Sequence, residues 1–253
     1  SSPVARGLSA PLNIPYSVAF ILSVAGDNEA LVARNGTGIE SVADLKGKRV
    51  ATPFASTAHY SLLAALDQAG LSASDVQLID LQPQAILAAW ERGDIAAAYT
   101  WLPTLAQLSE TGKTLITSRE LADRGKPTLD LAAVSNKFAA DNPKVVDIWR
   151  QQQARALNLI TNDPDAAAKA VAAEVGLNPD DVAQQLKAAV FLTPAEIGSP
   201  QWLGTDGRPG NLAANLESAS KFLADQKQIP EAAPLKVFQD ALYTQGLPDV
   251  LTR

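Results

Sequence analysis

The stretch STAHYSLLAAL (residues 56–66) brings together side chains that can form hydrogen bonds or take part in catalysis. Ser56 and Thr57 carry hydroxyl groups, and His59 is the only histidine of the chain. A histidine beside hydroxyls can act as a general base, bind a metal ion, or donate a hydrogen bond to a ligand. It can also be a partly buried side chain bonded to the backbone. The sequence leaves these alternatives open at this point.

Composition narrows the alternatives. The 253 residues have a formal net charge of -6, which works against binding to nucleic acid or an anionic membrane surface. With no cysteine and one histidine there are too few ligands for a zinc or iron site, so we expect neither metal nor cofactor. The lack of cysteine suits an exported protein. The chain has no apolar run of transmembrane length, and SSPVARGLSAP lacks a signal-peptide layout, so we expect a mature soluble protein or part of one.

The middle of the chain alternates short apolar runs with helical patterns. Strands are predicted at residues 49–53, 76–81 and 94–101, and each is followed by a stretch with helical spacing of apolar residues. A β-α-β series of this kind requires a parallel sheet with helices on both faces. From about residue 137 the pattern becomes almost entirely helical. We predict helices within residues 142–163, 164–176, 178–190 and 210–228.

Two further extended runs, residues 29–35 and 128–136, flank the β-α-β series. This arrangement is typical of one lobe inserted into another, with the two runs as the hinge. We predict lobe 1 at residues 1–33 and 131–253 and lobe 2 at residues 34–130. Ligands of open α/β lobes bind outside the carboxyl ends of the strands, here in the cleft between the lobes. Glu29 and Asp130 lie near the starts of the hinge runs, so we expect both acids at this cleft.

Several stretches resemble a known family. ALVARNGTGIESVADLKGKRVATP is similar to the entry into the second lobe of type II periplasmic solute-binding proteins. SSP, NEALV, STAHYSLLAAL, LQPQAILAAWERGDI, AYTW and PTLDL occur in the same order as in the taurine-binding proteins of ABC importers. The similarity covers most of residues 1–150. It implies a two-lobed α/β fold of the type II class, with parallel-type sheets flanked by helices, a hinge of two crossing segments and a helical C-terminal tail.

Members of this family carry a strand, a helix and a second strand before their Ser-Ser-Pro turn, whereas here Ser1 already belongs to that turn. Outside the inserted lobe, only residues 17–24 and the hinge runs are strand candidates. We therefore expect a shortened form whose first β-α-β unit is missing.

The resemblance implies taurine as the ligand, a sulfonate joined to an ammonium group. Neutral donors at helix starts can bind a sulfonate, and Ser2-Pro3, Ser56-Thr57 and Gln82-Pro83 are such starts. A neutral His59 near the positive end of its helix can donate to the same anion. The residues expected at the sulfonate are Ser1, Ser2, Ser56, Thr57, His59 and Gln82. The structural alternative for the hydroxyl residues is ordinary helix capping.

The ammonium group needs acceptors or an aromatic face. We expect Asp130 and Glu29 to supply carboxylates, and Trp101, at the end of its strand, to cover the cation. Tyr99 shares the strand face of Trp101. The structural alternatives are core packing for Trp101 and a hinge residue bonded to backbone for Asp130.

Other functions remain as alternatives. The chain could bind another sulfonate, nitrate or a thiamine precursor, or be an enzyme on the same fold, as some pyrimidine synthases are. A triad of Ser56, His59 and Asp130 can be drawn, but residues three apart on one helix turn do not by themselves aim the imidazole at the hydroxyl. We therefore predict a binding protein and not an enzyme. The resemblance also implies an ABC permease transmembrane subunit as partner and a periplasmic location. We expect a monomer, and leave membrane tethering open.

Overall fold

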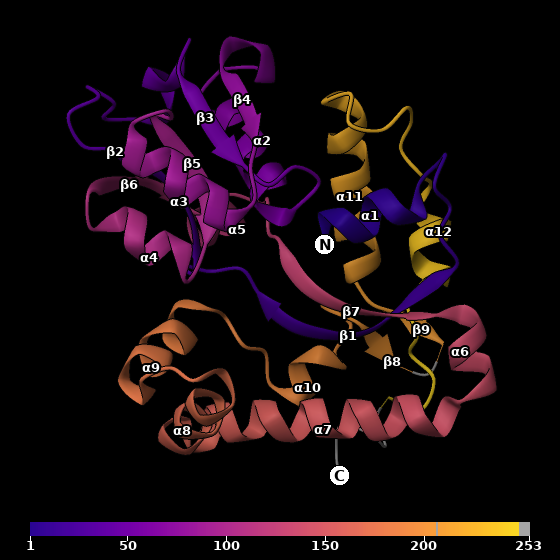
Figure 1. Ribbon diagram of the computed structural model, residues 1–253. Helices are drawn as coiled ribbons and strands as arrows, with labels where there is room; N and C mark the ends of the chain where they lie inside the picture. The colour runs from indigo at the N-terminus through magenta and orange to yellow at the C-terminus, as the bar shows by residue number, and fades with distance from the viewer. Residues whose placement is uncertain (206, 248–253) are drawn as a thin grey trace. The chain divides into compact units, whose positions relative to one another are not determined.

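The computed structural model describes residues 1–205 and 207–247 (Figure 1). The chain divides into two compact units, unit 1 with Ser1–Val24 and Leu129–Arg253, and unit 2 with Ala25–Thr128. The lobe boundaries expected from the sequence, 33/34 and 130/131, differ from this division and stay a prediction. The difference arises because β2 (Glu29–Arg34) pairs with strands on both of its sides and so lies inside the sheet of unit 2.

Unit 2 is built on a five-stranded sheet with strand order β4-β3-β5-β2-β6. β3 runs parallel to β4 and β5, as the β-α-β series predicted, whereas β2 is antiparallel to β5 and β6. The sequence did not predict β6, because its residues are mostly half-buried or exposed and lack a continuous apolar run. The bounds of the other strands are β3 (Arg49–Thr52), β4 (Gln77–Asp80), β5 (Ala97–Trp101) and β6 (Gly112–Thr117).

Helices cover both faces of this sheet (Figure 1). On one face an apolar cluster joins Ala98 of the sheet to Ile86 and Trp90 of α3 (Pro83–Arg92) and to Leu105 of α4 (Thr104–Ser109). The opposite face packs against α2 (Thr57–Gln68), which in turn contacts α5 (Ser118–Asp123). Gly93 ends α3 in the left-handed conformation at φ 76°, which favours glycine. Two short 3-10 turns, Val42–Leu45 and Ala73–Asp75, complete the unit.

Unit 1 contains an antiparallel pair, β1 (Tyr16–Val24) and β7 (Leu129–Ser135), so the sequence-based expectation of parallel-type pairing is wrong for these two strands. A short hairpin, β8 (Gly204–Thr205) with β9 (Arg208–Pro209), is also antiparallel. The first helix, α1 (Ser2–Leu8), begins one residue earlier than predicted, with Ser1 as its N-cap. It packs against α11 (Leu212–Asp225).

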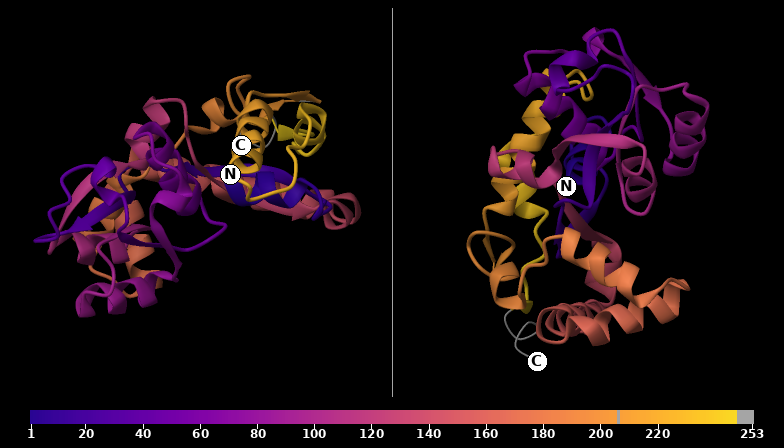
Figure 2. Two further views of the ribbon diagram at one scale, coloured as in Figure 1. Left: turned by 90° about the horizontal axis from the view of Figure 1, so that it is seen from above. Right: turned by 90° about the vertical axis from the view of Figure 1, so that its left-hand side faces the viewer.

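Among the described residues of unit 1, the other elements are helices, as the sequence predicted. α8 (Pro164–Val175) and α9 (Pro179–Ala188) pack against each other, and α8 contacts the long α7 (Pro143–Asn162), as Figures 1 and 2 show. The short helices are α6 (Asn136–Asp141), α10 (Pro194–Ile197) and α12 (Leu235–Asp240).

A buried arginine connects α7 to two other segments of unit 1. Arg150 is fully buried and donates hydrogen bonds to the carbonyl groups of Ala19 at 3.0 Å, Gln245 at 2.9 Å and Tyr243. Its guanidinium carbon also lies 4.4 Å from the centre of the Tyr243 ring. Burial lowers the pKa of Arg150, while the nearby Asp147 acts in the opposite direction. The guanidinium therefore provides donors to three backbone carbonyl groups that lie outside α7.

Candidate functional site

The carboxyl ends of the three parallel strands define one edge of the unit 2 sheet, where ligands of open α/β sheets bind. The start of β2 lies at the same edge, because Glu29 pairs directly with Trp101, the last residue of β5. The residues predicted in this unit all lie at this edge. They are Glu29, Ser56, Thr57, His59, Gln82 and Trp101.

The first turn of α2 is fixed by its own polar groups. The Ser56 hydroxyl accepts a hydrogen bond from the backbone N–H of His59 at 3.1 Å and donates to the carbonyl of Pro53 at 2.5 Å. Ser56 is thus the N-cap of α2. The structure therefore assigns a capping role to Ser56, and its proposed contact with a ligand stays a prediction.

Glu29 is the centre of a group of hydroxyl side chains that we call the Glu29 cluster: Glu29, Thr57, Ser61, Tyr99 and Ser118. The carboxylate, only 3% exposed, accepts from Thr57 at 2.6 Å, Ser118 at 2.8 Å and Ser61 at 3.3 Å. A hydrogen bond to a charged group contributes about 1.5–3 kcal/mol, so donors offset part of the cost of burying this carboxylate. Burial and, less strongly, the charge of Glu29 raise the pKa of Tyr99, whose hydroxyl lies 3.0 Å from that of Ser118.

His59 is held by the turn that precedes α2. Its Nδ1 accepts a hydrogen bond from the backbone N–H of Ala55 at 3.3 Å, and its ring stacks on Phe54 with 4.5 Å between centroids and 7° between planes. Ala55 adopts φ 60°, a conformation that residues with a Cβ rarely take. The backbone of Phe54 is held in turn by Asp80, which accepts from its N–H at 2.9 Å. The histidine, 4% exposed, is therefore a buried and oriented side chain.

Trp101 and Gln82 lie at the same sheet edge. Trp101 is half-buried, and its pairing with Glu29 places both side chains on the face that α2 covers. Gln82 is the exposed N-cap of α3, with Pro83 at the first helical position as predicted, and its side chain makes no capping hydrogen bond.

The other predicted residues belong to unit 1. Ser1 and Ser2 are buried at the start of α1, where the Ser1 hydroxyl accepts from the backbone N–H of Leu129 at 3.1 Å. Asp130, the next residue of β7, is exposed and accepts from the Ser23 hydroxyl at 2.8 Å. Within unit 1 the structure thus brings Ser1 close to the strand start that carries Asp130.

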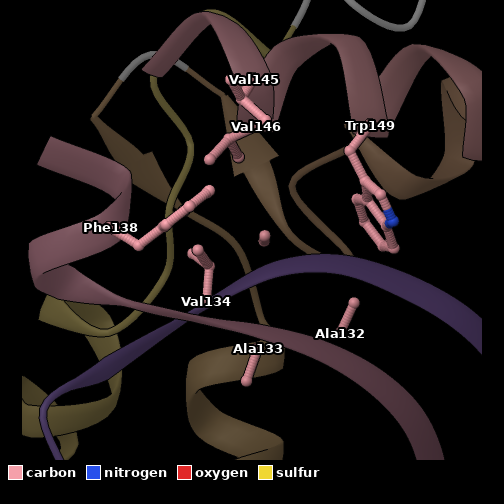
Figure 3. A pocket seen from close by; sticks show the side chains of 8 residues that line it. Ala132, Ala133, Val134, Phe138, Val145, Val146 and Trp149 are labelled. Carbon is pink, nitrogen blue, oxygen red and sulfur yellow. The ribbon is translucent and has the colours of Figure 1, made fainter. Parts of the chain in front are cut away.

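A cavity of about 270 Å³ in unit 1 has a different character (Figure 3). Its walls come from the β1–β7 pair, α6 and α7, and they are mostly apolar, with the indole nitrogen of Trp149 as a polar atom. The lining residues are Ala19, Ala132, Ala133, Val134, Phe138, Val145, Val146 and Trp149. Because these side chains offer no charged group, this cavity does not suit a zwitterion.

Sequence reasoning missed four residues at the site of unit 2. Ser61 and Ser118 complete the Glu29 cluster, and Phe54 stacks on His59. Thr52, the last residue of β3, is fully buried, and its hydroxyl has no hydrogen-bond partner among residues 1–205 and 207–247. Only the helical spacing of Thr57 and Ser61 could have indicated a shared partner, since residues four apart lie on one helix face.

Residues 1–205 and 207–247 include no group of three or more His, Cys, Asp or Glu side chains that could hold a metal ion. In this part of the chain, every helix is too short or too polar to cross a membrane.

Solved structures of other proteins share this fold. The periplasmic aliphatic sulphonate binding protein of Escherichia coli has a TM-score of 0.70 at 20% identity, covering 93% of this chain and 72% of that one. The alkanesulfonate-binding protein of Xanthomonas axonopodis pv. citri, bound to MOPS, has a TM-score of 0.69 at 19% identity. The likeness covers 97% of this chain and 86% of that one. A desulfurization enzyme has a TM-score of 0.69 at 17% identity, covering 99% of this chain and 83% of that one. The fold is therefore the type II periplasmic-binding-protein fold, as predicted.

Sequence relatives narrow this class to a family. The family model described as NMT1/THI5 like matches residues 17–167. The taurine-binding periplasmic protein of Escherichia coli is 36% identical over 92% of this chain, which spans 71% of that relative. A putative binding protein of Brucella abortus is 26% identical over 68% of this chain, which spans 54% of its length. The chain belongs to the NMT1/THI5-like family, and the resemblance inferred from its motifs is confirmed.

Proposed function

We propose that this chain is a solute-binding protein for taurine or a closely related aminosulfonate. The observation that carries this proposal is a buried carboxylate, Glu29, which accepts a hydrogen bond from Thr57, the first residue of α2, two residues before the oriented His59. This places groups of opposite hydrogen-bonding character at one sheet edge, which suits a ligand with a cation and an anion. The 36% identity to the Escherichia coli taurine-binding periplasmic protein supports the same ligand class.

The two ends of such a ligand need different partners. A sulfonate is anionic at every physiological pH, so neutral donors suffice, and the N-terminal turn of α2 together with His59 supplies them. An ammonium group needs carboxylates or an aromatic face, which we assign to Glu29, Asp130 and Trp101. Ser1, Ser2 and Gln82 remain proposed contacts of the sulfonate.

A thermal-shift panel tests this proposal. A ligand that binds only the folded state raises its stability by mass action, by about 2.7 kcal/mol at a concentration of 100 Kd. We expect taurine to raise the midpoint of unfolding more than ethanesulfonate, nitrate or a common amino acid does at equal concentration. Stabilisation by nitrate or a pyrimidine but not by taurine would contradict the proposal and favour one of the alternative ligands.

Catalysis is the second candidate, because a desulfurization enzyme shares the fold. A likeness at 17% identity shows the fold alone, and the chain has no cysteine to act as a thiol nucleophile. We propose that the protein returns its ligand unchanged. Incubation with taurine followed by mass spectrometry of the small molecules tests this: release of sulfite would show turnover.

We also propose that the protein delivers its ligand to the permease of an ABC importer in the periplasm. Relatives described as periplasmic binding proteins support this location. Ligand-dependent stimulation of the importer's ATPase in proteoliposomes is the expected result, and ATPase activity that is indifferent to the protein would contradict it.

A further inference from the structure

We propose that hydrogen-bond direction at the first turn of α2 fixes the orientation of the ligand, with Thr57 accepting from its ammonium group and His59 donating to its anionic group. This inference rests on the proposed function and assigns a separate role to each residue. It revises the sequence-based interpretation, in which Thr57 donates to the sulfonate.

The Thr57 hydroxyl has one hydrogen atom, and it is committed to Glu29. The Oγ1 atom lies 2.6 Å from Glu29 Oε2, and an ionised carboxylate can only accept. A hydroxyl whose hydrogen is donated in this way presents lone pairs to other partners. Thr57 is half-buried and so can be reached by a small molecule. Towards a ligand it therefore acts as an acceptor.

The rest of the Glu29 cluster keeps the Thr57 hydrogen in place. Ser118 and Ser61 donate to the other carboxylate oxygen, Oε1, whereas Thr57 donates to Oε2. Because Ser118 donates to Glu29, the Tyr99 hydroxyl is the donor in its contact with Ser118. If Thr57 turned its hydrogen to a ligand, a carboxylate that is 3% exposed would lose one of its donors. Removing a donor from a buried charge costs free energy, so the Thr57 hydrogen stays on Glu29.

His59 presents the opposite polarity. Its Nδ1 accepts from the backbone N–H of Ala55 at 3.3 Å, so this nitrogen carries no hydrogen. A neutral imidazole then carries its hydrogen on Nε2, which makes Nε2 a donor. Phe54 stacks on the ring and holds it in this orientation. One helix turn thus provides an acceptor at Thr57 and a donor at His59.

This polarity discriminates between the two ends of a zwitterion. A sulfonate has acceptors only and gains nothing from the Thr57 oxygen, whereas an ammonium group has donors only and gains nothing from His59 Nε2–H. Thr57 is therefore a specificity-determining residue for amino-bearing ligands. A ligand without an amino group uses His59 but not Thr57.

Calorimetry with two ligands and matched variants tests this assignment. We expect Thr57→Val, which keeps the shape but removes the hydroxyl, to weaken taurine binding at least about tenfold and ethanesulfonate binding less than about twofold. Thr57→Ser, which keeps the hydroxyl, should restore most of the taurine affinity that Thr57→Val loses. His59→Leu should weaken both, and His59→Gln, with its amide N–H, should restore part of the loss. Equal loss of both ligands in Thr57→Val would overturn the assignment.

The tautomer of His59 provides a second measurement that needs no variant and no ligand. Because the chain has one histidine, nitrogen NMR of histidine-labelled protein reports this ring alone. We expect the proton on Nε2 in the ligand-free protein, and a proton on Nδ1 would overturn the inference. If neither ligand bound the parent protein, the proposed function would fail, whereas the tautomer would still support or contradict the hydrogen-bond direction at His59.

Discussion

The Thr57 hydroxyl donates to the Glu29 carboxylate across 2.6 Å and so connects the first residue of α2 to the first residue of β2. This contact makes Glu29 part of the framework of unit 2 as well as a candidate ligand residue. We expect Glu29→Ala to lower the free energy of unfolding by about 2–4 kcal/mol, because the buried hydroxyls lose their acceptor. Glu29→Gln should cost less, since its carbonyl still accepts. Urea unfolding measures both.

Glu40, an exposed carboxylate in unit 2, provides the matched control for Glu29→Ala. Glu40 pairs with Lys113 at the surface, with side-chain exposures of 77% and 50%. We expect Glu40→Ala to change the free energy of unfolding by less than about 1 kcal/mol. Equal effects of Glu29→Ala and Glu40→Ala would show that the Glu29 cluster does not stabilise the fold.

Asp130 is exposed and accepts a hydrogen bond from Ser23 at 2.8 Å, so its carboxylate keeps acceptor capacity. We predict that Asp130→Ala lowers the affinity for taurine much more than that for ethanesulfonate, which has no ammonium group. Isothermal titration calorimetry measures both affinities. Ser23→Ala, which keeps the charge, is the control and should affect taurine less. Equal losses for the two ligands would count against Asp130 as an ammonium partner.

The buried Arg150 is expected to stabilise unit 1. Arg150→Met removes three donors to the backbone and should lower the free energy of unfolding by about 3–5 kcal/mol, because three carbonyl groups lose a hydrogen bond from a charged group. Arg155 is exposed on the same helix, α7, so Arg155→Met should have an effect within about 0.5 kcal/mol. Unfolding in guanidinium chloride measures the free energy of unfolding of both variants and of the parent. If the two variants lost equal stability, burial of Arg150 would not be the cause of its effect.

Burial of Tyr60 has a consequence at alkaline pH. It raises the pKa of the hydroxyl from 10.0 to about 12, so between these values the unfolded chain releases a proton that the folded protein retains. The contribution of Tyr60 to the free energy of unfolding is therefore fully present below pH 10 and falls as the pH rises towards about 12. The total loss is about 2–3 kcal/mol. Urea midpoints across this range should fall less in Tyr60→Phe than in the parent, and identical slopes would contradict the raised pKa.

The fold was predictable where one segment carries its own signal. The strand–helix pairs after residue 49 and the helices of the tail follow from local periodicity, which the structure confirms. β6 was missed because Gly112–Thr117 forms a sheet edge with little apolar content. The direction of β2 was missed because one strand's sequence does not reveal which neighbours it pairs with.

The candidate site was likewise predictable only where its residues share a local signal in the sequence. Ser56, Thr57 and His59 stood out because they share one helix start. Ser118 is 89 positions from Glu29, and no local pattern indicates that its hydroxyl reaches that carboxylate. Hydrogen-bond direction at Thr57 also depends on a tertiary contact, the one with Glu29, which no local pattern reveals.

Calorimetric titration of the unmodified protein with taurine, and with ethanesulfonate as its amine-free counterpart, is the most direct measurement of zwitterion recognition. We predict saturable binding of taurine that is at least about tenfold tighter than binding of ethanesulfonate, because only taurine engages the carboxylates and the Thr57 oxygen. Equal or tighter binding of ethanesulfonate would contradict it.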